Sequence, residues 1–269
     1  MATNEKAKSL SEIRDYWESA AQVQTDRDGL RPTARDPYLQ DVVESAIEKR
    51  LYRGAKLLDI GCGDGWSTVR FHRITGSTLG IDYIEEFVNS SRESAGDVQG
   101  LMFEQADAMD LSGIRANYGN FDVVTSIRCL INLSSWINQV KAIAEIASCV
   151  RPGGLYLTSE GWDEGMIGLN LMRERVGLPS LNVVEYNVMI SRNEFEEEVK
   201  KYFEIIDYIS LGYYLFTSRV LQPVMVAPEE PRHDHPLNRA AAMIQSQAIG
   251  SGAFYECDYA GVYVLRRKD

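Results

Sequence analysis

The chain has 269 residues, 45% of them hydrophobic and 25% charged, and its formal net charge is −11. These proportions are typical of a globular protein, and they exclude a disordered chain, a collagen and a small domain held together by disulfides. The acidic balance argues against a general basic surface for nucleic acid or anionic lipid. No apolar stretch approaches the roughly 18 residues that a membrane-spanning helix needs. The composition therefore predicts neither a nucleic-acid partner nor a membrane partner.

The cysteines are scattered along the chain and form neither a CxxC pair nor a Cys/His cluster with zinc spacing. Their spacing therefore predicts no metal site. Residues 1–8 are polar and lack the apolar core of a signal peptide. We expect reduced thiols in a cytoplasmic protein, at Cys62, Cys129, Cys149 and Cys257.

From residue 39 onward, helix-like and strand-like segments alternate. Apolar residues recur at helical spacing over 39–51, and Arg53-Gly54 ends that helix. Further helices are predicted at 66–74, 85–94 and 135–150. Buried strands are predicted between them, at 55–60, 78–82, 101–107, 121–127 and 155–160. This alternation is typical of βαβ units, which build an α/β fold with a parallel sheet covered by helices on both faces.

The last third of the chain is less regular. Ser191 and Glu194 have the spacing of a capping box, which predicts a helix from there to about Tyr202. The acidic run 196–198 within it is predicted to be a solvated face. Two more strands are expected, at 204–211 and 261–267. Because no low-complexity linker interrupts the chain, we expect a single domain over residues 1–269.

A glycine-rich turn over residues 61–65, with the sequence GCGDG, follows the first predicted strand and precedes a helix. Without a Cβ, its glycines let a ligand approach the backbone closely, and the N–H groups of a helix start face that ligand. The turn is GxGxG, which is neither the GxGxxG dinucleotide fingerprint nor a P-loop. An NAD-linked oxidoreductase on the same kind of sheet remains an alternative at this point.

Residues 59–65 resemble motif I of the class I S-adenosylmethionine-dependent methyltransferases. Further segments resemble other motifs of that family in the same order: 80–83, 105–108, 121–126 and 151–154. The matched region as a whole is about 53–160. The resemblance implies a Rossmann-like sheet of seven mostly parallel strands, with S-adenosyl-L-methionine as cofactor. It divides the domain into an N-terminal lid and first helix (1–52), a cofactor-binding core (53–160), and acceptor-shaping segments with the last strands (161–269).

By this resemblance, Asp82 takes the ribose hydroxyls, Asp107 accepts from the adenine amino group, and Arg128 lies beside the methionine part of the cofactor. A carboxylate can accept two hydrogen bonds from a diol, which supports the role of Asp82. Simpler roles stay open: a helix cap for Asp82, a loop cap for Asp107 and a surface charge for Arg128. The predicted cofactor-binding residues are Tyr16, Trp17, Arg35, Asp59, Gly61, Cys62, Gly63, Asp82, Tyr83, Asp107, Ala108 and Arg128.

Several of these residues have more than one interpretation. Tyr83 could lie against the adenine face or simply pack in the core. Tyr16, Trp17 and Arg35 belong to the segment that the resemblance interprets as a lid, with Arg35 able to pair with the cofactor carboxylate. An ordered surface helix would account equally well for the same segment.

The methyl acceptor should lie beyond the ends of the fourth and fifth strands, because ligands of open α/β sheets bind there. Glu160 ends the fifth strand and is the first candidate for a general base, needed only if the acceptor must lose a proton. His233 and His235 are further candidates, since histidine titrates near neutral pH. The alternative for Glu160 is a purely structural acid. The alternatives for the two histidines are an ordinary surface loop and a metal site formed together with Asp234.

The predicted reaction is methyl transfer by in-line displacement to an oxygen or nitrogen of a small molecule. Residues 127–130, IRCL, lack the Asp/Asn-Pro-Pro-aromatic box of DNA amino-methyltransferases. Stretches 170–179 and 219–238 resemble methyltransferases of polysaccharide or natural-product pathways, which makes a sugar derivative one candidate acceptor. The aromatic residues at 213–216, followed by Arg219, suit a ring-shaped or anionic molecule, but they fit a core or a homo-oligomer interface as well. A non-catalytic, methyltransferase-like binding protein is the remaining alternative.

Overall fold

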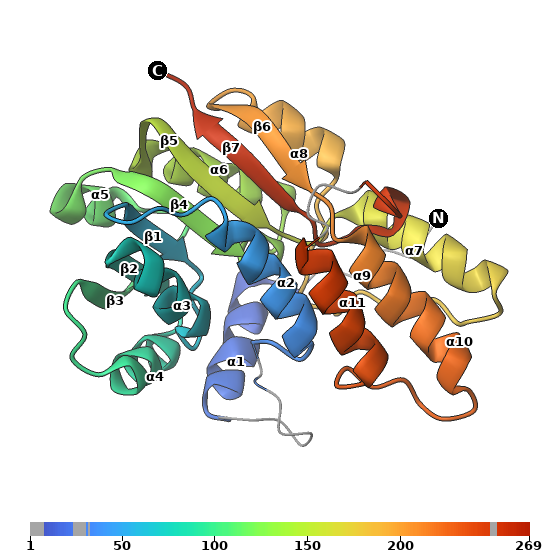
Figure 1. Cartoon of the computed structure of the whole chain (residues 1–269). Coiled ribbons are helices and arrows are strands. Elements are labelled where there is room, and N and C mark those ends of the chain that lie inside the picture. Colours follow the sequence, from blue (N-terminus) through green and yellow to red (C-terminus); the bar gives the residue numbers. More distant parts are fainter. Residues whose placement is uncertain (1–7, 24–30, 32, 248–251) are drawn as a thin grey trace.

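The computed structural model describes residues 8–23, 31, 33–247 and 252–269 (Figure 1). Residues 1–7, 24–30 and 32, which belong to the predicted lid, lie outside the described residues. In the part that is described, strands form one seven-stranded sheet in the order β3-β2-β1-β4-β5-β7-β6. The strands are β1 (Lys56–Ile60), β2 (Ser77–Asp82), β3 (Leu101–Gln105), β4 (Phe121–Ile127), β5 (Val150–Ser159), β6 (Phe203–Ile209) and β7 (Val262–Arg267).

Strands β1 to β5 pair in parallel, and β7 runs antiparallel between β5 and β6. The predicted Rossmann-like sheet of seven mostly parallel strands is therefore confirmed. The strand order places β1 and β4 in the middle, with the chain crossing from the β3 edge back to β4. In such a sheet the loops after β1 and β4 diverge at their carboxyl ends and leave room for a ligand between them.

Helices cover both faces of this sheet (Figure 1). They are α1 (Leu10–Ala21), α2 (Pro37–Glu48), α3 (Trp66–Thr75), α4 (Glu85–Ala95), α5 (Ser112–Tyr118), α6 (Trp136–Cys149), α7 (Asp163–Arg175), α8 (Arg192–Val199), α9 (Gly212–Phe216), α10 (Gln222–Val226) and α11 (Pro236–Gln247). Short helical segments are η1 (Leu130–Asn132), η2 (Thr217–Leu221) and η3 (Tyr255–Cys257). Segments α9, η2 and α10 follow one another directly, so residues 212–226 form one continuous helical stretch.

Two apolar clusters lie on opposite faces of the sheet. Alternate strand residues such as Leu58, Val124 and Leu265 pack with α6 and α8. Their neighbours, such as Leu57 and Val123, pack with α2, α9 and α11 on the other face. This alternation follows from the two-residue period of a β-strand, and it explains why the central strands are apolar throughout.

Several predicted boundaries shift. Strand β5 begins at Val150 rather than at residue 155, because Val150 pairs with Phe121 across an irregular register. Strand β3 ends at Gln105 and α8 ends at Val199, each a few residues before its predicted end. Ser191 accepts a hydrogen bond from the Glu194 N–H, which is one half of the predicted capping box.

The prediction of a fully solvated acidic run at 196–198 is wrong. Glu197 is exposed, but Glu198 is buried and accepts from the Lys201 ammonium at 2.5 Å. Glu196 accepts from the hydroxyl of Tyr263 at 2.9 Å. Consecutive residues of a helix point about 100° apart, so three in a row cannot share one solvent-facing side.

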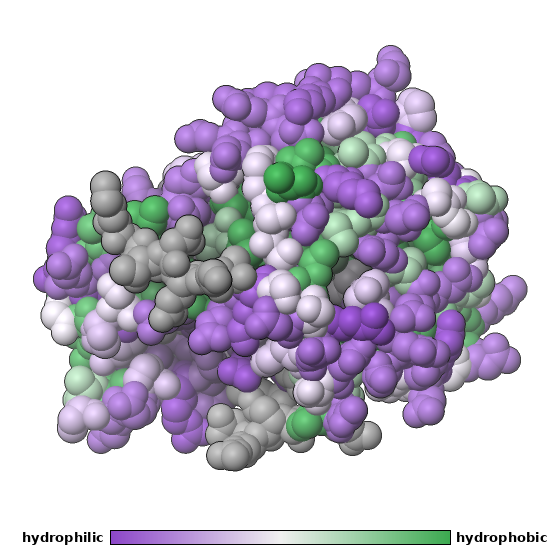
Figure 2. All heavy atoms as spheres, turned by 180° about the vertical axis from the view of Figure 1, so that it is seen from behind, coloured by the Kyte–Doolittle hydropathy of each residue, from purple (hydrophilic) through white to green (hydrophobic). Residues whose placement is uncertain are grey.

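The surface is mainly polar. Figure 2 shows hydrophilic side chains over most of the face opposite to the view of Figure 1, with separate apolar patches among them. Among the described residues, no helix is long and apolar enough to cross a bilayer.

Candidate active site

A cavity of about 350 Å³ lies at the carboxyl ends of the central strands. Its walls come from the loops after β1, β2, β3 and β4, from α1, and from segments 31–40 and 184–187. Pockets for small molecules typically measure about 300–1,000 Å³. The cavity is thus where the strand order predicts a ligand, and it is large enough for one.

The glycine turn between β1 and α3 forms part of the cavity wall. Gly61, Gly63 and Gly65 all have positive φ, at 70°, 54° and 75°. A Cβ on Gly61 would lie 2.7 Å from the Cys129 sulfur, and one on Gly65 would lie 2.7 Å from the Ser91 hydroxyl oxygen. Both the backbone conformation and the space therefore require glycine at these two positions.

We expect Gly65→Ala to lower the free energy of unfolding by about 2–5 kcal/mol, through backbone strain and overpacking together. Gly76, at the other end of α3, provides a matched control, because its φ is 76° and nothing lies within 4 Å of a Cβ built there. Gly76→Ala should cost only the strain, about 1–2 kcal/mol. Denaturant unfolding of both variants measures the difference, and equal losses would show that the contact with Ser91 is unimportant.

Asp82, at the end of β2, is bonded to the glycine turn. Its carboxylate accepts from the N–H of Gly63 at 2.8 Å and from the N–H of Ile84 at 2.9 Å. Burial raises its pKa above the ordinary value, against the effect of these hydrogen bonds. A carboxylate has about four lone-pair sites, so Asp82 can still accept from a ligand in the cavity that it lines.

Asp107 and Ala108 line the same wall, after β3. One oxygen of Asp107 accepts from the N–H of Met109 at 2.8 Å, so the carboxylate caps its own loop and keeps its other oxygen for a ligand. Tyr83 also lines the cavity, and the guanidinium of Arg14 lies 5.1 Å from the centre of its ring. The alternative of ordinary core packing does not hold for Tyr83, which is 45% exposed.

Asp59 lies at the bottom of the cavity and is 3% exposed. Its two oxygens accept from the hydroxyls of Thr68, at 2.6 Å, and Thr125, at 2.7 Å. Burial raises the pKa of Asp59 to about 6, despite these hydrogen bonds. The carboxylate therefore ties α3 and β4 to β1, and its main contacts are within the protein.

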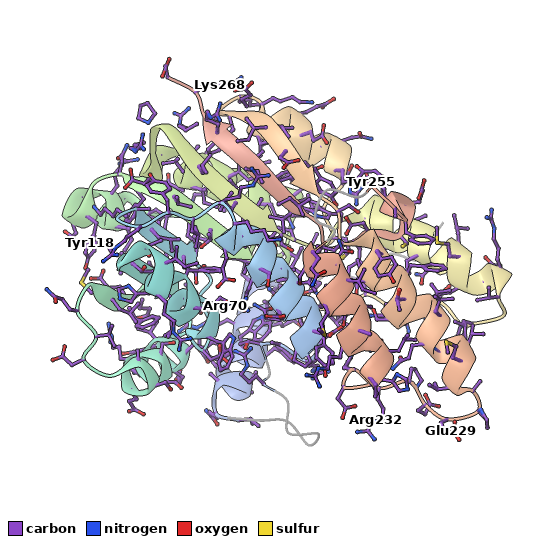
Figure 3. All side chains as sticks on the ribbon, in the orientation of Figure 1. Arg70, Tyr118, Glu229, Arg232, Tyr255 and Lys268 are labelled. Atoms are coloured by element: carbon purple, nitrogen blue, oxygen red, sulfur yellow. The ribbon has the colours of Figure 1, made fainter. Side chains whose placement is uncertain are left out.

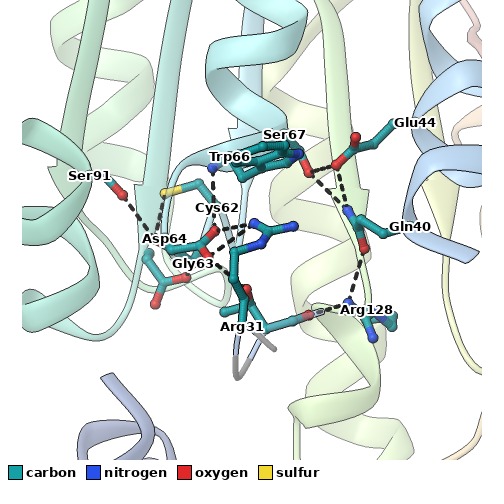
Figure 4. A network of polar contacts seen from close by, with 12 residues as sticks. Arg31, Gln40, Glu44, Cys62, Gly63, Asp64, Trp66, Ser67, Ser91 and Arg128 are labelled. Carbon is teal, nitrogen blue, oxygen red and sulfur yellow. Dashed lines mark hydrogen bonds and ion pairs between the residues drawn. The ribbon is translucent and has the colours of Figure 1, made fainter. Parts of the chain in front are cut away.

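Arg128 follows β4 and lines the cavity, with a backbone φ of 53°. One of its terminal nitrogens donates to the carbonyl of Thr33 and to the Gln40 side chain, the latter at 3.1 Å (Figure 4). The Gln40 amide donates in turn to Glu44 at 2.8 Å and to Ser67 at 2.9 Å. The network orients the guanidinium, whose remaining N–H groups are donors for a ligand. Arg128 is thus a lining residue rather than an outer-surface charge.

Glu44, on α2, connects this network to Arg70 on α3. It is 1% exposed, and its second oxygen accepts from Arg70 at 2.8 Å. Arg70, labelled in Figure 3, also donates to Asp41, Ser45 and Glu48 along α2. These contacts hold α2 against α3, and thereby keep Gln40 within reach of Arg128.

Helix α1 lies against the cavity. Its Trp17 donates to the Asn132 side chain at 3.1 Å and packs against Phe87, with ring centres 6.2 Å apart. Trp17 lines the cavity, but Tyr16 does not. Tyr16 instead stacks on Tyr186, with ring centres 4.1 Å apart, and donates to its hydroxyl at 3.1 Å. The prediction that Tyr16 contacts the ligand is therefore unsupported, because its ring backs a lining residue.

Residues 31 and 33–35 lie beside the glycine turn. Arg31 donates to both oxygens of Asp64, at 3.1 and 3.0 Å, and its guanidinium lies 4.5 Å from the ring centre of Trp66 (Figure 4). Thr33 donates to Asp64 at 3.0 Å. Arg35, which was predicted to bind the cofactor, is exposed and lines the cavity.

None of the predicted catalytic residues is among the described residues that line the cavity. Glu160 is 1% exposed, and its carboxylate accepts from the Ser126 hydroxyl at 3.0 Å and from the N–H groups of Cys129, at 3.3 Å, and Ile131, at 3.2 Å. Burial raises the pKa of Glu160 to about 7. The carboxylate holds the loop after β4 from beneath, which corresponds to the structural alternative.

The histidines lie before α11 and are not among the lining residues. His233 is 3.6 Å from Asp36, and burial together with Arg219 lowers its pKa. His235 accepts from the N–H of Leu237 at 3.1 Å, which makes it a cap for α11. Asp234 pairs with Arg232. Across the described ranges no His/Cys/Asp/Glu cluster could hold a metal ion, so the metal alternative at this loop finds no support.

The lining residues that were not among the predicted site residues include Gln40, Asn132 and Tyr186. Gln40 carried a signal, since it is a polar residue on the apolar side of the helix predicted over 39–51. Asn132 lies within the segment where the acceptor was expected. Tyr186 comes from a loop with no regular pattern, and its approach depends on tertiary packing alone.

The sequence and the fold were compared with known proteins. Residues 57–154 match the family model of a methyltransferase domain. Demethylmenaquinone methyltransferase of Staphylococcus aureus (strain MRSA252) is 25% identical over 183 residues, which cover 62% of this chain and 73% of that protein. The O-methyltransferase rstn1 of Aspergillus nomiae is 33% identical over 132 residues, 44% of this chain and 56% of that protein.

Among solved structures, magnesium protoporphyrin IX methyltransferase from Synechocystis PCC 6803, with S-adenosylhomocysteine bound, superposes with a TM-score of 0.59. The match covers 96% of this chain and 99% of that one at 14% identity, so it shows the shared fold. The NAD-linked oxidoreductase alternative finds no support in these comparisons. Residues 57–154 thus match a methyltransferase domain, and the seven-stranded sheet has the fold of a class I S-adenosylmethionine-dependent methyltransferase.

Proposed function

We propose that this enzyme transfers a methyl group from S-adenosylmethionine to an oxygen or nitrogen of a small molecule. The observation that carries the proposal is the cavity at the glycine turn, with carboxylates after β2 and β3 and a guanidinium after β4. All of the predicted cofactor-binding residues except Tyr16 are among its lining. The O-methyltransferase relative favours oxygen as the methylated atom.

The lining fits this cofactor. Gly61 and Gly63 bring the backbone of the turn to the cavity wall, and Asp82 keeps acceptor sites for the ribose hydroxyls. The second oxygen of Asp107 is available to an adenine amino group. Arg128, held by Gln40, has donors left for the carboxylate of the methionine part. When bound there, S-adenosylmethionine supplies a methyl group that its sulfonium makes electrophilic.

The protein's own contribution is to hold the acceptor in line and to exclude water. Trp17 on α1 and Asn132 on η1 are bonded across the cavity, and Tyr186 lies beside them. Holding two reactants in this way removes much of the entropic barrier, whereas no predicted base is placed to take a proton. Positioning is therefore the main catalytic effect that we propose. Sugar derivatives are among the small-molecule acceptors to be tested.

Calorimetric titration of the protein with S-adenosylhomocysteine and, separately, with NAD tests the cofactor. We expect binding of S-adenosylhomocysteine alone, since Asp82 and Asp107 suit one nucleoside and the turn lacks the dinucleotide fingerprint. Binding of NAD alone would contradict the proposal.

Transfer of a radiolabelled methyl group to a panel of phenols, amines and sugar derivatives then tests turnover. We expect label in at least one acceptor, at oxygen or nitrogen. A protein that binds S-adenosylhomocysteine and labels none of them would favour the non-catalytic alternative.

A further inference from the structure

We propose that Arg35 binds a carboxylate or phosphate group of the methyl acceptor. The site is the part of the cavity lined by Trp17, Arg35, Asn132, Leu133, Val184 and Tyr186, which we call the acceptor end. This inference rests on the proposed methyl transfer and narrows its acceptor to an anionic molecule.

Charge is segregated along the cavity. The carboxylates in the described lining are Asp59, Asp64, Asp82 and Asp107, and all of them lie at the carboxyl ends of β1, β2 and β3 or on the loops that follow. The acceptor end contributes no carboxylate from the described part of the chain. An anion placed there would meet no like charge, whereas at the other end it would meet several.

The arginines of the lining differ in what they already bind. Arg14 pairs with Glu18 at 2.5 Å, and Arg31 pairs with Asp64 at 3.0 Å. Arg128 is bonded to Gln40 beside the glycine turn, where the carboxylate of the cofactor is expected. Arg35 forms no ion pair with any carboxylate that the structure describes. Arg128 can serve the donor carboxylate, and Arg35 is then left for the acceptor, in place of the cofactor role predicted for it from the sequence.

The neighbouring carboxylate does not neutralise Arg35. Asp36 accepts from Arg219, from the Tyr214 hydroxyl at 2.7 Å and from the N–H of Leu39 at 3.0 Å. Burial would raise the pKa of Asp36, but the charge of Arg219 and these hydrogen bonds hold it below its ordinary value. Asp36 is therefore ionised, and its charge is balanced by Arg219 on the other side of the chain.

Tyr186 contributes a hydroxyl to the acceptor end. Its ring is fixed by stacking on Tyr16, and its hydroxyl accepts from that of Tyr16 at 3.1 Å. Burial and Tyr16 raise the pKa of Tyr186, and the positive charges of Arg35 and Arg128 oppose this rise. A hydroxyl that lines the same cavity as these two guanidinium groups is suited to an oxyanion.

The remaining walls of the acceptor end are apolar or aromatic. Trp17, Leu133 and Val184 join the ring of Tyr186 there. Small-molecule sites usually combine such walls with a few polar groups that fix orientation. The acceptor that fits has a flat apolar body and an anionic group directed at Arg35, so that the methylated atom faces the glycine turn.

The test uses the protein saturated with S-adenosylhomocysteine and titrated with benzoate, phenyl phosphate or benzyl alcohol. We expect benzoate or phenyl phosphate to bind more tightly than neutral benzyl alcohol, and the tighter of the two identifies the group. Arg35→Gln should weaken that anion about tenfold or more. It should leave the affinities for benzyl alcohol and S-adenosylhomocysteine unchanged. Arg73→Gln, on the exposed side of α3, removes the same charge elsewhere and should change nothing.

Different failures have different meanings. If S-adenosylhomocysteine itself does not bind, the proposed function fails. If it binds but Arg35→Gln weakens it together with the anion, Arg35 serves the cofactor and the inference is overturned. The inference is also overturned if benzyl alcohol binds as tightly as the anions, if neither anion binds at millimolar concentration, or if Arg35→Gln leaves anion binding intact.

Discussion

Replacement of Asp82 by alanine is expected to weaken S-adenosylhomocysteine binding by about 1.5–3 kcal/mol, a loss of roughly tenfold to 150-fold. The carboxylate both holds the Gly63 N–H at 2.8 Å and offers acceptor sites to a diol. Its removal takes away the ligand contact and loosens the turn against which the ligand lies. Calorimetric titration measures the loss directly.

A second variant separates these two effects. Asp82→Asn keeps one oxygen that can accept from Gly63, so it should preserve the turn and lose mainly the contact with the diol. Asp97→Ala, an exposed acid after α4, removes the same charge and should bind normally. Unchanged affinity in both Asp82 variants would refute the ribose role and leave Asp82 as a cap for the turn and for α4.

Glu160→Ala should lower the free energy of unfolding by about 2–5 kcal/mol. It would leave the Ser126 hydroxyl and the N–H groups of Cys129 and Ile131 without their acceptor in a buried place. Glu160→Gln should cost much less, because one amide oxygen can still accept from Ile131 while its NH₂ donates to the Ser126 hydroxyl. Denaturant unfolding of the two variants gives the comparison.

The rate of methyl transfer by the Glu160→Gln variant then shows whether Glu160 is a positioning residue or a base. As a positioning residue, Glu160 can be replaced by glutamine with most of the rate retained, whereas a base cannot. Loss of transfer in Glu160→Gln at unchanged stability and unchanged S-adenosylhomocysteine affinity would restore Glu160 as the general base of the sequence prediction.

The pKa of Glu160 also predicts a pH dependence. Burial raises this pKa from 4.5 to about 7, so the folded protein holds a proton that the unfolded chain has already released between these values. The contribution of Glu160 to stability therefore falls as pH rises from about 4.5 to 7, by up to roughly 3 kcal/mol. Unfolding of Glu160→Gln across this range should lack that fall, and parallel curves for the two proteins would contradict the raised pKa.

The sequence predicted the fold and the donor side of the cavity because both depend on local patterns. Asp82 and Asp107 follow strands directly, and parallel strands end at one edge of a sheet, so their placement needed only the strand assignment. The glycine turn depends on its own backbone conformation. For these residues, the position in the chain determines the position in the site.

The catalytic candidates could not be judged in this way. Glu160 also ends a strand, but its side chain points beneath the loop after β4 rather than into the cavity, and a strand pattern does not give that direction. His233 and His235 lie in a loop whose path depends on α11 and Asp36. Tyr186 lines the cavity while its ring packs against Tyr16 and Trp17 of α1. Each of these depends on contacts between segments far apart in the sequence.

The two ends of the cavity have different origins along the chain. The donor side comes almost wholly from the family-matched residues 57–154, while Trp17, Arg35 and Tyr186 come from outside them. On the roles proposed above, chimeras that exchange these flanking segments between relatives should change the preferred acceptor and leave S-adenosylhomocysteine binding unchanged. An enzyme built in this way can acquire a new substrate without rebuilding its donor site.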